Sequence, residues 1–125
     1  MDFELSEELE LIRDTAREFA ETELMPNAGR WDQEAYYPAE ALRQAGELGL
    51  CGMTIPEEYG GSEMGNLALC VAMEEINRGC ASCGVTLSVH NSLLGTPITK
   101  YGTEDQKRRF LPRLASGEWI GAYSL

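Results

Sequence analysis

The sequence is short of basic side chains and of long hydrophobic runs, and each shortage excludes a class of function. It has 10 Lys and Arg against 21 Asp and Glu, a formal net charge of −11 over 125 residues. Nucleic-acid surfaces need clustered positive charge to displace counterions, so nucleic-acid binding is excluded. No apolar run approaches the roughly 18 residues of a membrane span. The start, Met-Asp-Phe-Glu-Leu, resembles neither a signal nor a transit peptide, so a cytoplasmic location is expected.

Common catalytic signatures are also missing. The sequence contains no G-x-G-x-x-G dinucleotide fingerprint, no P-loop and no G-x-S-x-G nucleophile elbow. His90 is the single histidine. It lies in an apolar stretch, so a hydrogen-bonded core histidine is favoured over a partner for a nucleophilic cysteine. The composition, with 43% hydrophobic and 25% charged residues, is that of one globular domain.

The four cysteines, at positions 51, 70, 80 and 83, suit a reducing compartment. Cys80-Ala-Ser-Cys83 has C-x-x-C spacing, but Cys51 and Cys70 are not spaced as the second pair that a structural zinc site needs. We therefore expect free thiols that behave as small buried apolar residues. A redox dithiol and a zinc site are the weaker alternatives, and no metal ligand is assigned.

Apolar residues recur at steps of three and four, which predicts helices. Five are expected, over residues 7–25, 38–48, 67–77, 82–101 and 104–116. Ser6 and Asn66 are the expected N-caps of the first and third, and Thr103 with Gln106 forms a capping box for the fifth. Pro26 is expected to end the first helix.

The fourth of these helices is apolar on nearly every side, which predicts a central, buried position. Pro97 should kink it near Leu93, the residue whose carbonyl the proline ring would meet. In the fifth helix, Pro112 should bend or split the chain, and Gly117 should end it.

Residues 51–65 are rich in Gly and Pro and predict a loop. Within it, the Gly60–Gly61 pair favours a plain tight turn over a set of backbone donors for an anion. The end, Trp119–Leu125, is aromatic and aliphatic and is typical of the start of a strand. The predicted fold class is therefore all-α, an antiparallel bundle of about five helices with the start of a β-strand. We expect a helical domain over 1–117 and the beginning of a second domain over 118–125.

Three segments resemble the acyl-CoA dehydrogenases. They are Pro56-Glu-Glu-Tyr-Gly-Gly61, the stretch from Tyr101-Gly-Thr-Glu-Asp-Gln-Lys-Arg-Arg-Phe to Leu-Pro-Arg-Leu-Ala-Ser-Gly-Glu118, and Gly121-Ala-Tyr-Ser-Leu125. The resemblance runs from Leu5 to Leu125. It implies the N-terminal helical domain of a three-domain flavoprotein, followed by the first residues of a middle β-domain. The intact protein would oxidise an acyl-CoA thioester with FAD, form a homotetramer and pass electrons to an electron-transferring flavoprotein.

Carried over by position, the resemblance makes Tyr123, Ser124 and Leu125 the first residues that line the flavin. It also places Thr86, Val89 and Leu93 on the wall of the acyl pocket. Their spacing of three and four puts these three on one helix face. Ordinary core packing is the alternative for them.

The glutamate base of the family lies outside this region, so no catalytic residue is assigned here. We expect this chain alone neither to retain FAD nor to oxidise an acyl-CoA. Two alternatives stay open: a fragment of a nitroalkane oxidase or flavin-dependent monooxygenase of the same fold, and a free-standing helical module that binds a partner without catalysis.

Overall fold

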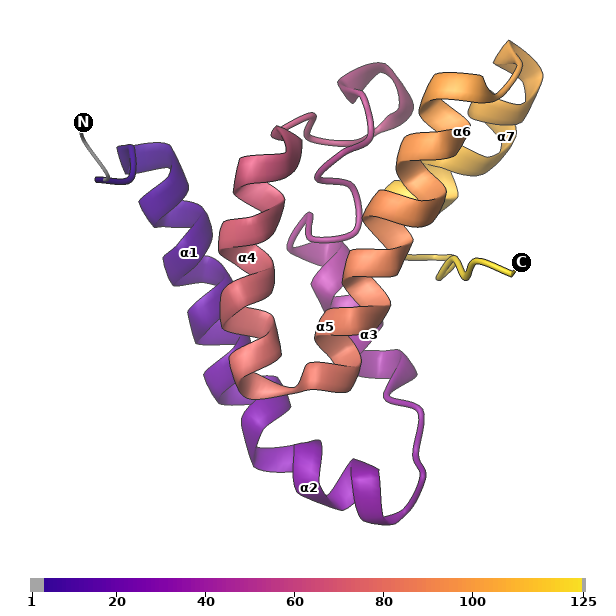
Figure 1. The fold of residues 1–125 in the computed structure, drawn as a ribbon. Coiled ribbons are helices and arrows are strands. Elements are labelled where there is room, and N and C mark those ends of the chain that lie inside the picture. Colours follow the sequence, from indigo (N-terminus) through magenta and orange to yellow (C-terminus); the bar gives the residue numbers. More distant parts are fainter. Residues whose placement is uncertain (1–3, 125) are drawn as a thin grey trace.

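The computed structural model describes residues 4–124, which form helices joined by loops (Figure 1). Several helices follow one another without a break, so the α- and π-helices of the described chain form five continuous segments. These segments are α1 (Glu7–Phe19) with η1 (Ala20–Leu24) and α2 (Met25–Gln33), α3 (Ala39–Glu47), α4 (Gly65–Gly79), α5 (Ala81–Val89) with η3 (His90–Gly95) and α6 (Thr96–Tyr101), and α7 (Glu104–Ala115). The all-α prediction is confirmed.

The expected end of the first helix at Pro26 is wrong. The helix continues to Gln33 through the π-helical turn η1, and Pro26 is the second residue of α2. A proline ring clashes with the carbonyl four residues before it, here that of Thr22. Thr22 lies inside η1, where the wider π turn makes room for the ring. At the start of the segment, the Ser6 hydroxyl accepts a hydrogen bond from the Leu9 amide at 3.3 Å, so that N-cap is confirmed.

Pro97 and Pro112, which lie within later helical segments, behave differently from each other. The helix is irregular where the kink is expected, because Leu93 lies in the π turn η3, which ends two residues before Pro97. Pro112 lies inside α7, which is not split. The capping box of Thr103 and Gln106 at the start of α7 is confirmed in both directions.

The segment 51–64 is a loop apart from η2, a short 3-10 helix (Glu57–Tyr59). Gly60 has a φ of 88° and its amide donates to the Glu57 carbonyl, while the Gly61 amide donates to the Pro56 carbonyl. A Cβ on Gly61 would lie 2.0 Å from the Ile55 carbonyl oxygen, so only glycine fits. Both amides serve the turn, which confirms the plain-turn prediction. The Asn66 cap is wrong: α4 begins at Gly65, and Met64 is its N-cap without a side-chain hydrogen bond.

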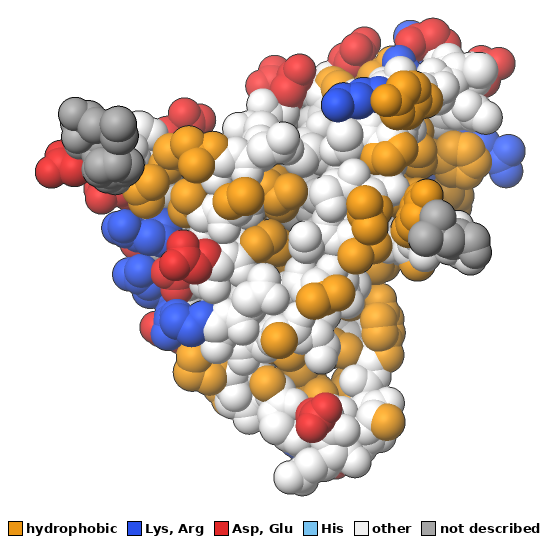
Figure 2. Space-filling model, in the orientation of Figure 1, with side chains coloured by type: hydrophobic (Ala, Val, Ile, Leu, Met, Phe, Trp, Pro, Cys, Tyr) orange, Lys and Arg blue, Asp and Glu red, His pale blue; other side chains and the backbone are white. Residues whose placement is uncertain are grey.

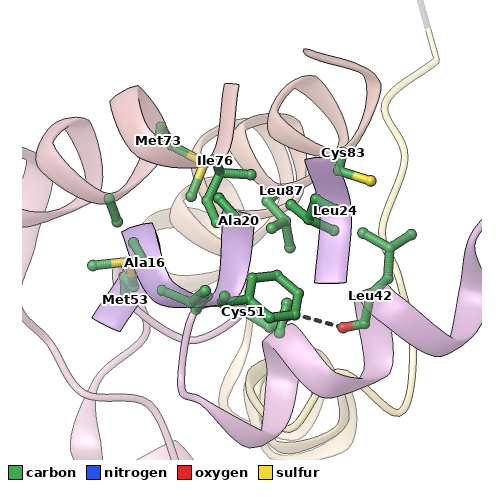
Figure 3. Packing of buried hydrophobic residues seen from close by; sticks show 14 of the residues in the cluster. Ala16, Ala20, Leu24, Leu42, Cys51, Met53, Met73, Ile76, Cys83 and Leu87 are labelled. Carbon is green, nitrogen blue, oxygen red and sulfur yellow. Dashed lines mark hydrogen bonds between the residues drawn. The ribbon is translucent and has the colours of Figure 1, made fainter. Parts of the chain in front are cut away.

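The core lies where α1, η1, α3, α4 and α5 meet (Figure 3). Its fully buried side chains interlock from all of these elements, and Gly79 lets α4 approach η1 closely, since a Cβ there would lie 2.9 Å from that of Ala20. The members of the core labelled in the figure are Ala16, Ala20, Leu24, Leu42, Cys51, Met53, Met73, Ile76, Cys83 and Leu87. A smaller cluster under α7 contains Ile55, Tyr59, Leu111, Leu114 and Ala115.

The expected strand at the C-terminus is not formed in its described part, residues 119–124. A strand needs a partner for its backbone groups, and the described chain offers none. The Trp119 amide instead donates to the Arg113 carbonyl at 3.1 Å, and the Gly121 amide donates to His90. The C-terminal segment, residues 118–124, therefore lies against the helices as irregular backbone.

Charged side chains gather over α1, and hydrophobic ones run along α5 and α6 (Figure 2). The acids of α1 are exposed to solvent. The helix itself lies on the opposite side of the molecule from the C-terminal segment (Figure 1). A chain of ion pairs, Arg17–Glu75–Arg78–Glu21, joins α1 and η1 to α4. None of the helices in residues 4–124 has the length and hydrophobicity to cross a bilayer.

Candidate functional site

The segment α5–η3–α6 has an open apolar face. The prediction that this helix is buried on nearly every side is therefore wrong. Cys83, Gly84 and Leu87 are buried, whereas Val85 is 59% and Leu93 44% exposed. The hydrophobic pattern of a helix does not distinguish a face that packs in the core of its own chain from a face that binds a ligand or another domain. We call the exposed side of Val85, Val89 and Leu93, spaced by four residues, the open face.

The three residues assigned to acyl binding all lie on or beside this face. Thr86 and Val89 are half-buried and Leu93 is exposed. The Thr86 hydroxyl donates to the Ser82 carbonyl at 2.9 Å, which leaves its methyl group as the part available to a neighbour. Core packing is the alternative for these residues, but it does not hold for Leu93 because that side chain is 44% exposed.

A hollow of about 240 Å³ lies beside Thr86, between the start of α5 and the link from α2 to α3. Sequence reasoning missed this link as a wall of the site. Its side chains there are those of Ala35, Tyr36, Tyr37 and Pro38. Partial burial raises the pKa of Tyr37 above its ordinary value. The phenol is neutral at physiological pH. Two adjacent tyrosines before a proline were the available signal.

A second, larger hollow of about 700 Å³ lies between α6, α7 and the C-terminal segment. It is mainly apolar, and its aromatic members Phe110 and Trp119 have ring centroids 6.3 Å apart. The Arg113 guanidinium lies 4.5 Å from the centroid of Trp119 and holds that ring by a cation–π contact. The hollow is lined by Leu94, Ile98, Phe110, Leu114, Glu118, Trp119, Ile120 and Gly121.

Two of the three residues assigned to flavin binding are described. Tyr123, 53% exposed, and Ser124 extend beyond the second hollow with their side chains open to solvent. Leu125 lies outside the described residues. Tyr123 and Ser124 follow Gly121, which is hydrogen bonded to η3, so the structure brings this segment next to the helix that carries Thr86, Val89 and Leu93.

His90 links the C-terminal segment to the helical segment that carries Thr86, Val89 and Leu93. Its ring is completely buried, and its Nδ1 accepts from the Gly121 amide at 3.0 Å. Because a backbone amide can only donate, Nδ1 carries no proton, and Nε2 donates to the Leu114 carbonyl at 3.0 Å. Burial lowers the pKa of His90, against the opposing effect of the Leu114 carbonyl. The prediction of a hydrogen-bonded core histidine is confirmed.

Asn91, the next residue, is a buried polar group that sequence reasoning missed. Its Oδ1 accepts from the Met53 amide at 3.1 Å, and its Nδ2 donates to the Leu50 and Leu87 carbonyls at 2.9 and 3.0 Å. The side chain thus fixes the beginning of the 51–64 loop to η3. An amide side chain within an apolar helix was the signal that could have found it.

All four cysteines are free thiols, as expected. Cys51, Cys80 and Cys83 are buried, but Cys70 is exposed, which corrects the expectation of four buried residues. Burial raises the pKa of both Cys51 and Cys83 to about 12, so neither forms the thiolate that redox chemistry requires. In residues 4–124, no three His, Cys, Asp or Glu side chains are grouped in a way that could hold a metal ion.

Comparison with known proteins decides the family. The model of the acyl-CoA dehydrogenase N-terminal domain matches residues 6–118. The chain belongs to the acyl-CoA dehydrogenase family. It is 48% identical over 122 residues to the mitochondrial short-chain specific acyl-CoA dehydrogenase of Bos taurus, a match that covers 98% of this chain.

Solved structures of similar fold include the following two. A chain in the structure described as the electron-transferring flavoprotein of Acidaminococcus fermentans matches 96% of this chain, with a TM-score of 0.91 and 39% identity. An acyl-CoA dehydrogenase complexed with FAD from Bacillus anthracis matches 94%, with a TM-score of 0.86 and 32% identity. This chain spans 30% of the bovine relative and 32% and 20% of the two solved chains.

Proposed function

We propose that this chain is the N-terminal helical domain of an FAD-dependent acyl-CoA dehydrogenase, in which residues 118–125 begin the middle domain. The open face of α5–η3–α6 carries the proposal. It is an apolar surface left uncovered by its own chain, between a hollow at Thr86 and a larger one at the C-terminal segment. Such surfaces on soluble proteins mark places where a ligand or another domain binds.

The residues near the C-terminus fit a flavin. A flavin ring is planar and apolar with a polar edge, and Tyr123 and Ser124 present an exposed aromatic ring and a hydroxyl beside an apolar hollow. Tyr123, Ser124 and Leu125 would hold one side of the ring. When bound, FAD would supply the acceptor for the hydride that leaves the acyl chain.

The acyl chain would lie on the open face. Thr86, Val89 and Leu93 offer a methyl group and two aliphatic side chains to it. Tyr36 and Tyr37 wall the hollow beside Thr86, so they would limit how far an acyl chain extends in that direction. The identity to a short-chain specific enzyme supports a short acyl group.

The proposal extends to the partners of the intact protein: an acyl-CoA substrate, an electron-transferring flavoprotein and a homotetrameric assembly. The likeness to a chain in the Acidaminococcus fermentans structure supports the second of these. The base that removes the substrate proton is not assigned to this chain, so dehydrogenation by the chain alone is not expected. The cytoplasmic location expected from the sequence stays a prediction.

A chimera tests the proposal. In the bovine short-chain enzyme, the matched 122 residues would be replaced by those of this chain. We expect a purified yellow protein that bleaches on addition of butyryl-CoA, while this chain alone stays colourless. Because the base in the chimera comes from the bovine enzyme, a chimera that binds FAD but oxidises no acyl-CoA would mean that this domain does not bind the acyl group, which favours the nitroalkane oxidase or monooxygenase alternative. If this chain folds cooperatively as a monomer and does not assemble with the downstream domains, the free-standing binding module is favoured.

Two variants of the chimera test the open face. Leu93→Asp should lower kcat/KM about a hundredfold or more, because an unpaired carboxylate in an apolar site costs several kcal/mol. Leu67→Asp, at an exposed leucine of α4, is the matched control and should leave activity nearly unchanged. Equal effects of the two substitutions would remove the acyl-binding role from this face.

A further inference from the structure

The C-terminal segment is held to the helices by a small number of contacts that end at Gly121. The Trp119 amide donates to the Arg113 carbonyl, and Ile120 packs against the main core. Gly121 lies tightly against Leu94, since a Cβ there would be 1.9 Å from Leu94 Cδ2. Gly121 is the last residue in the described part of the chain that hydrogen bonds to the helical body, and residues 122–124 are exposed.

The position of Tyr123 and Ser124 therefore depends on where Gly121 is fixed. They follow it by two and three residues, a reach of about 7–10 Å in an extended chain. A shift or rotation of the Gly121 peptide would be carried directly to both side chains.

The group that fixes this peptide is the His90 ring, which contacts two separate segments at once. Nδ1 accepts from Gly121 in the C-terminal segment, and Nε2 donates to the Leu114 carbonyl in α7. The ring is completely buried, so water does not compete for either bond. One neutral tautomer satisfies both partners, and the ring acts as a rigid spacer between them.

We propose that His90 is a positioning residue that ties the Gly121 peptide to α7 and thereby sets where Tyr123 and Ser124 meet the flavin. The inference rests on the proposed function for its second half, the flavin. Its first half, control of the segment, concerns this chain alone and can be measured separately.

Two substitutions separate the two hydrogen bonds of the His90 ring, because each keeps one and removes the other. The side-chain amide of asparagine is attached to Cγ, as Nδ1 is, whereas the amide of glutamine extends one atom further, toward the place of Nε2. His90→Asn can therefore still accept from Gly121 but loses Leu114. His90→Gln can still donate to Leu114 but loses Gly121. Each removes one buried hydrogen bond, so a merely structural role predicts similar effects from both.

The first experiment is NMR on the nitrogen-15 labelled chain. In the parent we expect a through-hydrogen-bond coupling between the Gly121 amide nitrogen and His90 Nδ1, with the proton of the ring on Nε2. Relative to the Trp119 amide as internal reference, Gly121 should exchange about tenfold faster in His90→Gln, the factor that one hydrogen bond is worth, and stay near the parent rate in His90→Asn. A missing coupling, or equal exchange in the two variants, overturns the proposal.

The second experiment places the same variants in the bovine chimera. We expect the FAD of His90→Gln to dissociate several-fold faster and its visible circular dichroism to change, with His90→Asn close to the parent. Unchanged flavin signals in His90→Gln, together with a released Gly121 amide, would show that the tie does not position the flavin. If the parent chimera binds no FAD, the proposed function fails, and the NMR result still decides whether His90 holds the segment.

Discussion

The segments α1–η1–α2 and α5–η3–α6 each contain a π turn that ends two residues before a proline, Pro26 or Pro97. In both, the carbonyl that the proline ring would strike lies inside the π turn. Their surroundings differ. In η1 the buried side chains are the apolar Ala20 and Leu24, and its acids face solvent.

In η3 the buried side chains include two polar ones, His90 and Asn91, which hydrogen bond to backbone groups of three other segments. The same local solution to a proline therefore serves two purposes. In the first segment it lets the helix continue past Pro26. In the second it also holds the 51–64 loop and the C-terminal segment in place beside the candidate site.

The largest effect is expected at Asn91. Asn91→Leu keeps the approximate size of the side chain but leaves the Met53 amide and the Leu50 carbonyl buried without their partner. Each buried unsatisfied group costs about 1–3 kcal/mol, so we expect a loss of roughly 2–6 kcal/mol in the free energy of unfolding, measured with urea. Ser92→Ala in the same π turn is the control, since Ser92 is exposed and bonds only to the preceding turn. Similar losses for both variants would mean that the buried hydrogen bonds of Asn91 do not hold η3 in place.

A smaller effect is expected at Glu75, where the first segment meets α4. Glu75 is only 7% exposed and accepts from Arg17 at 2.8 Å and from Arg78 at 3.0 Å. The hydrogen bond from Arg17 lowers the pKa of this carboxyl, so it stays ionised at neutral pH. Glu75→Gln should cost about 1–3 kcal/mol in urea unfolding, because two charged partners lose their counter-charge in a partly buried place.

The matched control for Glu75 is Glu40→Gln. Glu40 also pairs with an arginine, Arg43, but both are exposed to solvent. Exposed pairs contribute little, so its loss should be much smaller than that at Glu75. Equal losses would show that burial adds nothing to the α1–α4 contact.

As the pH is lowered, we expect the free energy of unfolding to fall first because of His90 in η3, and only at lower pH because of Glu75. The pKa of His90 is lowered in the folded chain, so between that value and about 6.5 the unfolded chain binds a proton that the folded chain does not. Stability is therefore full above pH about 6.5 and falls as pH falls toward the folded pKa. In His90→Asn this part of the loss should vanish, so the stability gap between parent and variant should narrow on acidification. A gap that is constant from pH 7 to about 5 would contradict the buried neutral ring.

The fold could be predicted from the sequence wherever the signal is local. Ser6, Thr103 and Gln106 cap helices through their own neighbours, and Gly60 needs only its own φ to end a turn. Pro97 was expected to distort its helix because the clash with Leu93 is a property of one helical turn. The continuation past Pro26 was missed because whether a helix stops or widens at proline depends on what packs around it.

The candidate site depends on contacts between distant segments, and this is why less of it could be predicted. Leu93 and Leu87 have the same residue type on the same helix, yet one is exposed and the other completely buried. Which side is open depends on the arrangement of α1, α3 and α4 against α5. The Trp119–Leu125 segment has a strand's composition, but the partner that would make it a strand is not in the described chain. Tyr36 and Tyr37 reach Thr86 only because the α2–α3 link folds back over α5.

The smallest effects, and the most direct test of the comparison, come from the two prolines. Replacing either by alanine restores a backbone donor and removes the clash that the π turn accommodates. In the first segment α2, beyond the turn, has no fully buried residue, so Pro26→Ala should let η1 relax toward regular α-helix. We expect a gain of up to about 1 kcal/mol and carbon-13 shifts of residues 20–24 that move toward α-helical values.

In the second segment, relaxation would rotate His90 or Asn91 away from its partners, or move the buried Gly95 and the half-buried Ile98 out of place. A rotation of one residue, about 100°, would break the bonds to Met53, Leu114 and Gly121. Pro97→Ala should therefore leave the shifts of residues 90–95 unchanged and give little or no gain in stability. If η3 relaxes to α-helix as readily as η1, Pro97 alone causes its π turn. The hydrogen bonds of His90 and Asn91 would then not be what keeps the turn π-helical.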